Sequence, residues 1–259
     1  MRKLHAVLLI VAACVVSACT TTSEGYSSTA NASPEAALES YTSLGLQYLR
    51  AGNTASAKGP LQRALQIDSN YAPAFNALAL VFQAEDDMAL AEGYFRKAVA
   101  ADPQSAMIHN NFGAFLYSRQ RFEEACQELA RATEDPFYQA RAQAFENMGR
   151  CYRKIGRLDV AEHAFNRALT LSRQRPIALI ELADILLAKG DAAGATALFD
   201  QFREYVDAKQ IDHFSLSLWV GVRVARHEKN AGRAATYALL LKNMFPESAE
   251  YRLYKESAQ

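Results

Sequence analysis

A period of 34 residues runs through most of this chain and restricts it to an architecture of stacked repeats. Leu44 and Gly45 recur as Leu78 and Ala79, 34 residues further on. A large residue followed by Gly or Ala returns in the same slots of the next three units, at Phe112-Gly113, Met148-Gly149 and Leu182-Ala183. Because a unit of this length cannot bury its own apolar face, we expect neighbouring units to stack into a continuous core.

The second half of each unit carries a small, a large and again a small residue at helical spacing. In the first unit these are Ala57, Leu61 and Ala64, which the period of a helix places on one face. Gly52 lies between the two halves, where a turn between paired helices is expected. The pattern resembles the tetratricopeptide repeat, a helix–turn–helix unit of 34 residues.

This resemblance implies an all-α fold, a right-handed superhelical solenoid of about six tetratricopeptide repeats over residues 35–257. No segment alternates apolar and polar residues over the length of a strand, so we expect no sheet. The period breaks near residues 210–214, and the unit that follows is degenerate. The repeats are placed at about 38–71, 72–105, 106–139, 142–175 and 176–209, with the degenerate unit at 215–248.

Residues 1–18 have the features of a lipoprotein signal peptide. Arg2 and Lys3 form a basic start, and the apolar run that follows is shorter than the roughly 20 residues that a helix needs to cross a bilayer. The stretch from Val16 to Cys19 resembles the lipobox of bacterial lipoproteins, in which the Cys becomes the first mature residue and carries acyl chains. We therefore expect covalent lipid on Cys19. The alternative is an ordinary signal peptide in which this Cys is incidental.

Residues 19–34 are rich in Ser and Thr and predict a flexible tether between the lipid and the folded body. Thr20 stands where an Asp would, by the rule of the lipoprotein family, retain the chain at the inner membrane. We therefore expect a lipid anchor in the outer membrane, on its periplasmic face. Ser33, Pro34 and Glu35 then predict a helix start, with a cap, a Pro at the first helical position and an acid in the first turn.

The sequence contains no complete catalytic or metal-binding motif. Lys plus Arg and Asp plus Glu balance at 28 each, so we expect no nucleic-acid partner. His227 and Glu228 begin like a zinc-protease motif, but Ala231 stands where the second His ligand would be. We therefore expect no metal, no cofactor besides the lipid, no small-molecule substrate and no enzymatic activity. An enzyme of cell-wall metabolism is the alternative of a different class.

Cys126 and Cys151 fall on two helices that should be neighbours, in the second half of one unit and the first half of the next. An oxidising compartment permits a disulfide between them. Two unlinked thiols that act as small buried hydrophobes are the preferred interpretation.

A partner would bind on the concave side of such a solenoid, which is lined by the first helix of each pair. At about 100° per residue, the slots away from the buried face hold apolar and amide residues in units one to three. Exposed apolar side chains mark interaction sites, and Asn side chains could bond the backbone of a bound peptide. The predicted groove comprises Leu46, Leu49, Asn76, Leu80, Gln83, Met107, Asn110, Ala114 and Tyr117, and the charged slots of unit four hold Glu146 and a basic flank of Arg150, Arg153 and Lys154. The alternative is that these residues are buried against the tether or a neighbouring repeat.

Longer stretches carry a more specific resemblance. The runs from His109 to Gly113, Arg121 to Ala125, Phe145 to Gly149 and Leu241 to Pro246 are similar to the PilF/PilW family of type IV pilus biogenesis lipoproteins. The resemblance implies a pilotin, a lipoprotein on the inner leaflet of the outer membrane that binds the subunit of the pilus secretin and promotes its localisation and multimer assembly. The alternative is another envelope repeat lipoprotein, acting as a scaffold in outer-membrane protein assembly or as an adaptor for cell-wall hydrolases.

Overall fold

The computed structural model describes residues 33–257, and every regular element in that range is an α-helix. This confirms the all-α prediction. The helices are α1 (Pro34–Arg50), α2 (Thr54–Ile67), α3 (Ala72–Ala84), α4 (Met88–Ala101), α5 (Ala106–Ser118), α6 (Phe122–Ala132), α7 (Arg141–Lys154), α8 (Leu158–Leu171), α9 (Pro176–Lys189), α10 (Ala192–Asp207), α11 (Ser215–His227), α12 (Ala231–Met244) and α13 (Ala249–Glu256).

The first helix begins where the sequence predicts a cap. The Ser33 side chain accepts a hydrogen bond from the backbone amide of Ala36 at 3.2 Å, and Pro34 occupies the first turn, where its missing N–H leaves no bond unmade. The turn to α2 passes through Gly52 with φ of 75°. In the second pair the corresponding turn passes through Asp86 with φ of 62°, so this left-handed position is not reserved for glycine.

The small and large slots of the repeat meet in the core. Ala57, Leu61 and Ala64 on α2 have no exposed surface, and the large residues Phe95 and Phe165 in the corresponding slots are equally buried. The small residues let the paired helices approach closely, and the large ones fill the space between pairs. Stability therefore comes from stacking of neighbouring pairs, as expected for a solenoid.

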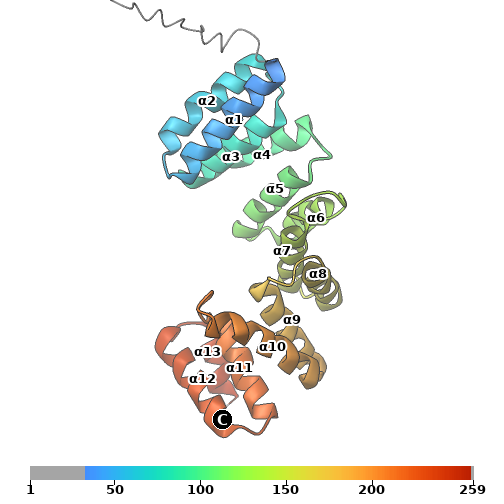
Figure 1. Cartoon of the computed structure of the whole chain (residues 1–259), viewed down its shortest axis with the longest axis vertical. Coiled ribbons are helices and arrows are strands. Elements are labelled where there is room, and N and C mark those ends of the chain that lie inside the picture. The colour runs from blue at the N-terminus through green and yellow to red at the C-terminus, as the bar shows by residue number, and fades with distance from the viewer. Residues whose placement is uncertain (1–32, 258–259) are drawn as a thin grey trace, which may run out of the picture.

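The molecule curves, so that both ends of the described chain lie on the same side of its middle in Figure 1. The first helices of successive pairs, α1, α3, α5, α7, α9 and α11, contact one another along the whole stack. Within residues 33–257, no contact joins the second helices of successive pairs, such as α4 with α6 or α6 with α8. The first helices therefore line the inner side of the curve.

The regular stacking is interrupted between α10 and α11, where residues 208–214 form no helix. The connector ends in a local cap, because the backbone amide of Phe214 donates to the Ser217 hydroxyl at 3.0 Å. Ile211 and Phe214 turn back onto the core around α9 and α10. The last helix, α13, packs against α11 and α12. The break in the sequence period thus corresponds to a structured connector.

None of the helices between residues 33 and 257 has both the length and the hydrophobicity that crossing a bilayer requires. The predicted signal peptide at 1–18, the predicted lipid on Cys19 and the predicted tether up to residue 32 lie outside the described residues.

Candidate partner-binding surface

The two Asn residues of the predicted groove are buried and bonded within the protein. Asn76 is 3% exposed, and its side-chain oxygen accepts from Asn111 on α5 at 3.2 Å. Asn110 is 8% exposed and accepts from Asn147 on α7 at 3.1 Å. The prediction that they bond a partner's backbone is therefore wrong. The two hydrogen bonds between amide side chains link α3 to α5 and α5 to α7, which are the first helices of successive repeats.

The apolar residues of the predicted groove divide into two groups. Leu46, Leu49 and Leu80 are half-buried because their side chains pack onto the core of the first three pairs. Met107 and Ala114 on α5 are exposed, with Met107 at 41%. The half-buried Gln83 lies at the end of α3, and the half-buried Tyr117 lies at the end of α5. The surface available to a partner is thus richest along α5.

Two of the four charged slots of unit four, Glu146 and Arg153, are paired within the protein. Glu146, expected to face outward, is 3% exposed and pairs with Arg175, whose Nη2 lies 2.8 Å from its Oε1. Arg153 donates to both Glu181 and Asp184 on α9. Burial disfavours the charged form of Arg153, but these two carboxylates outweigh that effect and raise its pKa.

Arg223 on α11 completes this network, because its Nη1 donates to Asp184 Oδ1 at 2.5 Å. The four side chains join α7, α9 and α11 and neutralise one another. The other two residues of the predicted flank behave differently. The guanidinium of Arg150 lies over the ring of Tyr117, 5.4 Å from its centroid, and Lys154 is exposed. Burial raises the pKa of the Tyr117 phenol, and the charge of Arg150 partly opposes this.

A hollow of about 610 Å³ lies on the inner face beside Tyr117, Arg150 and Lys154, and we call it the C-terminal hollow. It extends from α5 and α7 across α9 to the connector and α13. Its lining comprises Tyr117, Arg150, Arg153, Lys154, Ile177, Glu181, Ile211, Phe214, Leu216 and Glu250. The volume is in the range of sites that bind small ligands or peptide side chains.

Sequence reasoning found one side of this hollow and missed the other. Tyr117 and the basic flank follow from the repeat register. Ile211 and Phe214 lie in the connector, where the register is lost, and Glu250 lies beyond the last predicted repeat. The break in the 34-residue period was the sequence feature that pointed to the connector. A smaller depression of about 100 Å³, lined by Ala114, Tyr117, Leu129, Asn147 and Arg150, continues the hollow along α5.

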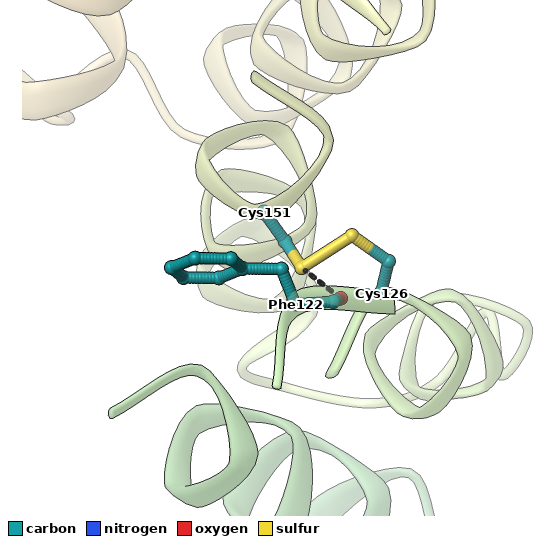
Figure 2. The surroundings of a disulfide bond; sticks show 3 residues. All are labelled: Phe122, Cys126 and Cys151. Atoms are coloured by element: carbon teal, nitrogen blue, oxygen red, sulfur yellow. Dashed lines mark hydrogen bonds between the residues drawn. A yellow bond between two sulfur atoms is a disulfide. The ribbon is translucent and has the colours of Figure 1, made fainter. Parts of the chain in front are cut away.

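Cys126 on α6 and Cys151 on α7 form a disulfide, with their Cα atoms 5.5 Å apart. Figure 2 shows the bond linking the second helix of one pair to the first helix of the next. The preference for unlinked thiols is therefore wrong. Cys151 Sγ also lies 3.1 Å from the carbonyl oxygen of Phe122, and because a disulfide sulfur has no proton to donate, this is a sulfur–oxygen contact.

No group of three His, Cys, Asp or Glu side chains in the described part of the chain could hold a metal ion. His109 is a buried titratable group, with a side chain that is 2% exposed. Its Nδ1 lies 2.5 Å from Glu128 Oε2, and its Nε2 lies 3.0 Å from the Pro103 carbonyl oxygen. Glu128 and, more weakly, the Pro103 carbonyl raise the pKa of His109 against the opposing effect of burial. With both nitrogens bonded in this way, the ring joins α5, α6 and the loop before α5.

Comparisons with known proteins agree with the fold. Models of the tetratricopeptide repeat match residues 42–106, 104–174 and 146–208. The chain is 36% identical over 251 residues to the type IV pilus assembly protein PilF of Pseudomonas aeruginosa, which covers 97% of this chain and 98% of that protein. Among solved structures, P. aeruginosa PilF superposes with a TM-score of 0.77 at 38% identity, covering 86% of this chain and 99% of that one. PilW, described as a widely conserved type IV pilus biogenesis factor, superposes with a TM-score of 0.67 at 29% identity, covering 84% of this chain and 97% of that one.

Proposed function

The chain belongs to the PilF/PilW family of type IV pilus biogenesis proteins, and we propose that within it the chain acts as a pilotin. In this role it binds the subunit of the pilus secretin and promotes the localisation and multimer assembly of that subunit at the outer membrane. The observation that carries the proposal is the similarity to PilF, which extends over nearly the whole chain. Membership of this family makes the chain a tetratricopeptide protein of pilus biogenesis and not an enzyme.

The inner face supports protein binding in this role. Met107 and Ala114 present exposed apolar surface on α5, which we call the α5 strip. An apolar segment of the secretin that covers this strip would remove it from water, which favours association. The contact surface that we propose comprises Leu46, Leu49, Leu80, Gln83, Met107, Ala114 and Tyr117, without the buried Asn76 and Asn110.

Lipid on Cys19 would position the protein in this proposal. A single acyl chain gives only marginal membrane binding, so a stable anchor needs more than one chain. Cys19 is followed by the Ser/Thr-rich segment that precedes α1, and this segment would let the folded body reach a partner in the periplasm. The proposed location is the periplasmic face of the outer membrane.

Co-purification from detergent-solubilised envelopes, read by mass spectrometry, tests the partner. We expect the full chain to retain the secretin subunit and Met107→Glu/Ala114→Glu to lose it, because two carboxylates cannot be buried against an apolar segment. Leu90→Glu/Leu239→Glu is the matched control, since Leu90 on α4 and Leu239 on α12 are 46% and 58% exposed and lie on the second helices of their pairs. Circular dichroism should show the same helix content for all three proteins.

Equal retention of the secretin by the double variant and the control would contradict the proposed surface. Retention of an outer-membrane assembly factor or a cell-wall hydrolase in place of the secretin would favour the scaffold or adaptor role instead. The anchor is tested separately by membrane fractionation, in which Cys19→Ser should be lost from the outer-membrane fraction. A Cys19→Ser chain that still fractionates with the outer membrane would refute the lipid anchor.

A further inference from the structure

The C-terminal hollow depends on the irregular connector. A regular solenoid would pass from the fifth pair to the sixth in a short turn, which would leave this part of the inner face open. Here residues 208–214 place Ile211 and Phe214 in the wall of the hollow, and α13 contributes Glu250 on another side. The departure from the repeat thus converts an open inner face into a hollow with walls on several sides.

The lining of the hollow includes apolar side chains from several segments of the chain. Tyr117, Ile177, Phe214 and Leu216 come from four different segments of the chain. Three of them also pack onto the buried core, whereas Ile177 at the start of α9 does not. A side chain that lines a hollow without supporting the core is available to a ligand, and burying it would stabilise a complex.

The charges of the hollow are not balanced locally. Arg153 is satisfied by Glu181 and Asp184, and Arg223 shares Asp184, so this network leaves no net charge. Arg150 and Lys154 remain, four residues apart on α7 and therefore on one face of the helix. Between residues 33 and 257 no ion pair joins either of them to a carboxylate. Glu250 on α13 is the other acid of the lining; it forms no ion pair within the described residues, but its charge helps to raise the pKa of Arg153.

We propose that the C-terminal hollow is a docking site for a polypeptide segment in which a carboxylate side chain neighbours a bulky apolar side chain. The apolar side chain covers Ile177, Phe214 and Leu216, and the carboxylate pairs with Arg150 and Lys154 on α7. Glu250 repels a carboxylate brought next to α13, so the hollow favours a segment whose acid approaches α7. The shallow continuation past Ala114 and Asn147 suits an extended chain better than a compact small molecule.

This site goes beyond the proposed secretin role, because its charges and apolar lining define a segment whichever protein carries it. The hollow shares Tyr117 with the proposed secretin contact surface and its continuation includes Ala114, but the variants that test the two sites differ. Met107 does not line the hollow, and Arg150 and Lys154 are not part of the strip.

Fluorescence anisotropy with two designed peptides tests the site, using the full chain in detergent. One fluorescein-labelled peptide carries two Asp residues immediately before a Phe-Leu pair, and its twin carries two Lys residues at the same positions. We expect the acidic peptide to bind and its affinity to fall as salt is added, because the ion pairs are partly exposed. The Lys twin should bind at least about tenfold more weakly, because like charges then meet at α7.

Four variants locate the binding. Arg150→Glu/Lys154→Glu should weaken the acidic peptide at least about tenfold and improve its Lys twin. Ile177→Asp should weaken the acidic peptide, whereas Ile177→Leu should retain it, because Leu restores the apolar volume. Arg63→Glu/Lys242→Glu carries the same change in net charge on α2 and α12, away from the hollow, and should bind like the wild type.

The proposal is overturned if the wild-type chain binds neither peptide, if it binds both equally, or if the double variant on α7 binds the acidic peptide as the wild type does. These outcomes are separate from the secretin test. If the secretin does not co-purify, the anisotropy result still decides the hollow. If the peptide does not bind, co-purification still decides the contact of the α5 strip with the secretin.

Discussion

Gly149 on α7 lies against the ring of Phe165 on α8, so closely that a Cβ atom added to the glycine would stand 2.7 Å from Cε1 of the ring. Gly113 has the same relationship to Leu129 in the preceding pair, with an added Cβ 2.6 Å from Cγ of the leucine. The spacing of the paired helices is therefore set by the absence of a side chain in one slot and the size of the side chain opposite.

Gly149→Ala should destabilise the protein although alanine is the better helix former. Its intrinsic gain of about 1 kcal/mol is outweighed by overpacking against Phe165, which costs about 1–3 kcal/mol. Gly93→Ala is the control, because Gly93 lies within α4 and an added Cβ there meets nothing within 4 Å. It should raise stability by about 0.5–1 kcal/mol. Urea midpoints measure both, and a stabilising Gly149→Ala would refute the close-packing explanation.

Removing the Cys126–Cys151 disulfide should lower stability by about 3 kcal/mol, because the cross-link closes a loop of 25 residues in the unfolded chain. Cys126→Ala/Cys151→Ala should unfold at a lower temperature than the oxidised wild type. A reductant should lower the Tm of the wild type towards that of the double variant and leave the variant unchanged. Equal effects of the reductant on both proteins would show that the bond contributes nothing.

His109 should stabilise the protein most under mildly acidic conditions. Both of its ring nitrogens face oxygen acceptors, and its pKa in the folded state is raised above the ordinary value of about 6.5. Its contribution is therefore complete below about pH 6.5 and declines as the pH rises through the folded-state pKa. The difference in unfolding free energy between wild type and His109→Gln should shrink from pH 5.5 to pH 8.5.

The pH dependence of the unfolding free energy of the wild type alone does not isolate His109, so the comparison with His109→Gln is needed. His213 shifts in the opposite direction, because burial lowers its pKa and favours the neutral ring. Its contribution is lost as the pH falls, which partly masks the effect of His109. If the difference in unfolding free energy between wild type and His109→Gln grows with pH, the ring is not a protonated one with both nitrogens hydrogen-bonded.

Glu146→Ala should cost about 3 kcal/mol, because it leaves the guanidinium of Arg175, which is 17% exposed, without its carboxylate partner. Glu123→Ala on α6 is the control, since Glu123 is exposed and takes part in no ion pair described within residues 33–257. That change should alter stability by less than about 0.5 kcal/mol. Equal unfolding midpoints for the two variants would show that Glu146 is not held as a buried ion.

The fold was predictable because the residues that recur in each repeat are the ones that pack against one another. Gly45 opposite Leu61, and Gly113 opposite Leu129, appear in the sequence as a small residue and a large one at fixed spacing. One repeat therefore determines the arrangement of the next. The cap at Ser33 was equally readable, because it is a local hydrogen bond.

The site was less predictable because its residues are defined by their neighbours. Helical spacing placed Asn110 and Glu146 outward but could not show that Asn147 and Arg175 would cover them. It could not show that Arg153 would be neutralised from α9, nor that Cys126 and Cys151 would meet in bonding geometry. The connector wall at Ile211 and Phe214 follows no period at all.

The disulfide has a consequence for how the array comes apart. Each helix pair rests only on adjacent elements, so fraying that starts at one terminus advances one pair at a time. The covalent bond between α6 and α7 blocks this advance at the boundary of the third and fourth pairs. Amide protons in α6 and α7 should accordingly exchange with deuterium more slowly than those of α1 or α13. The helices on either side of the bond then unfold locally while α6 and α7 remain folded.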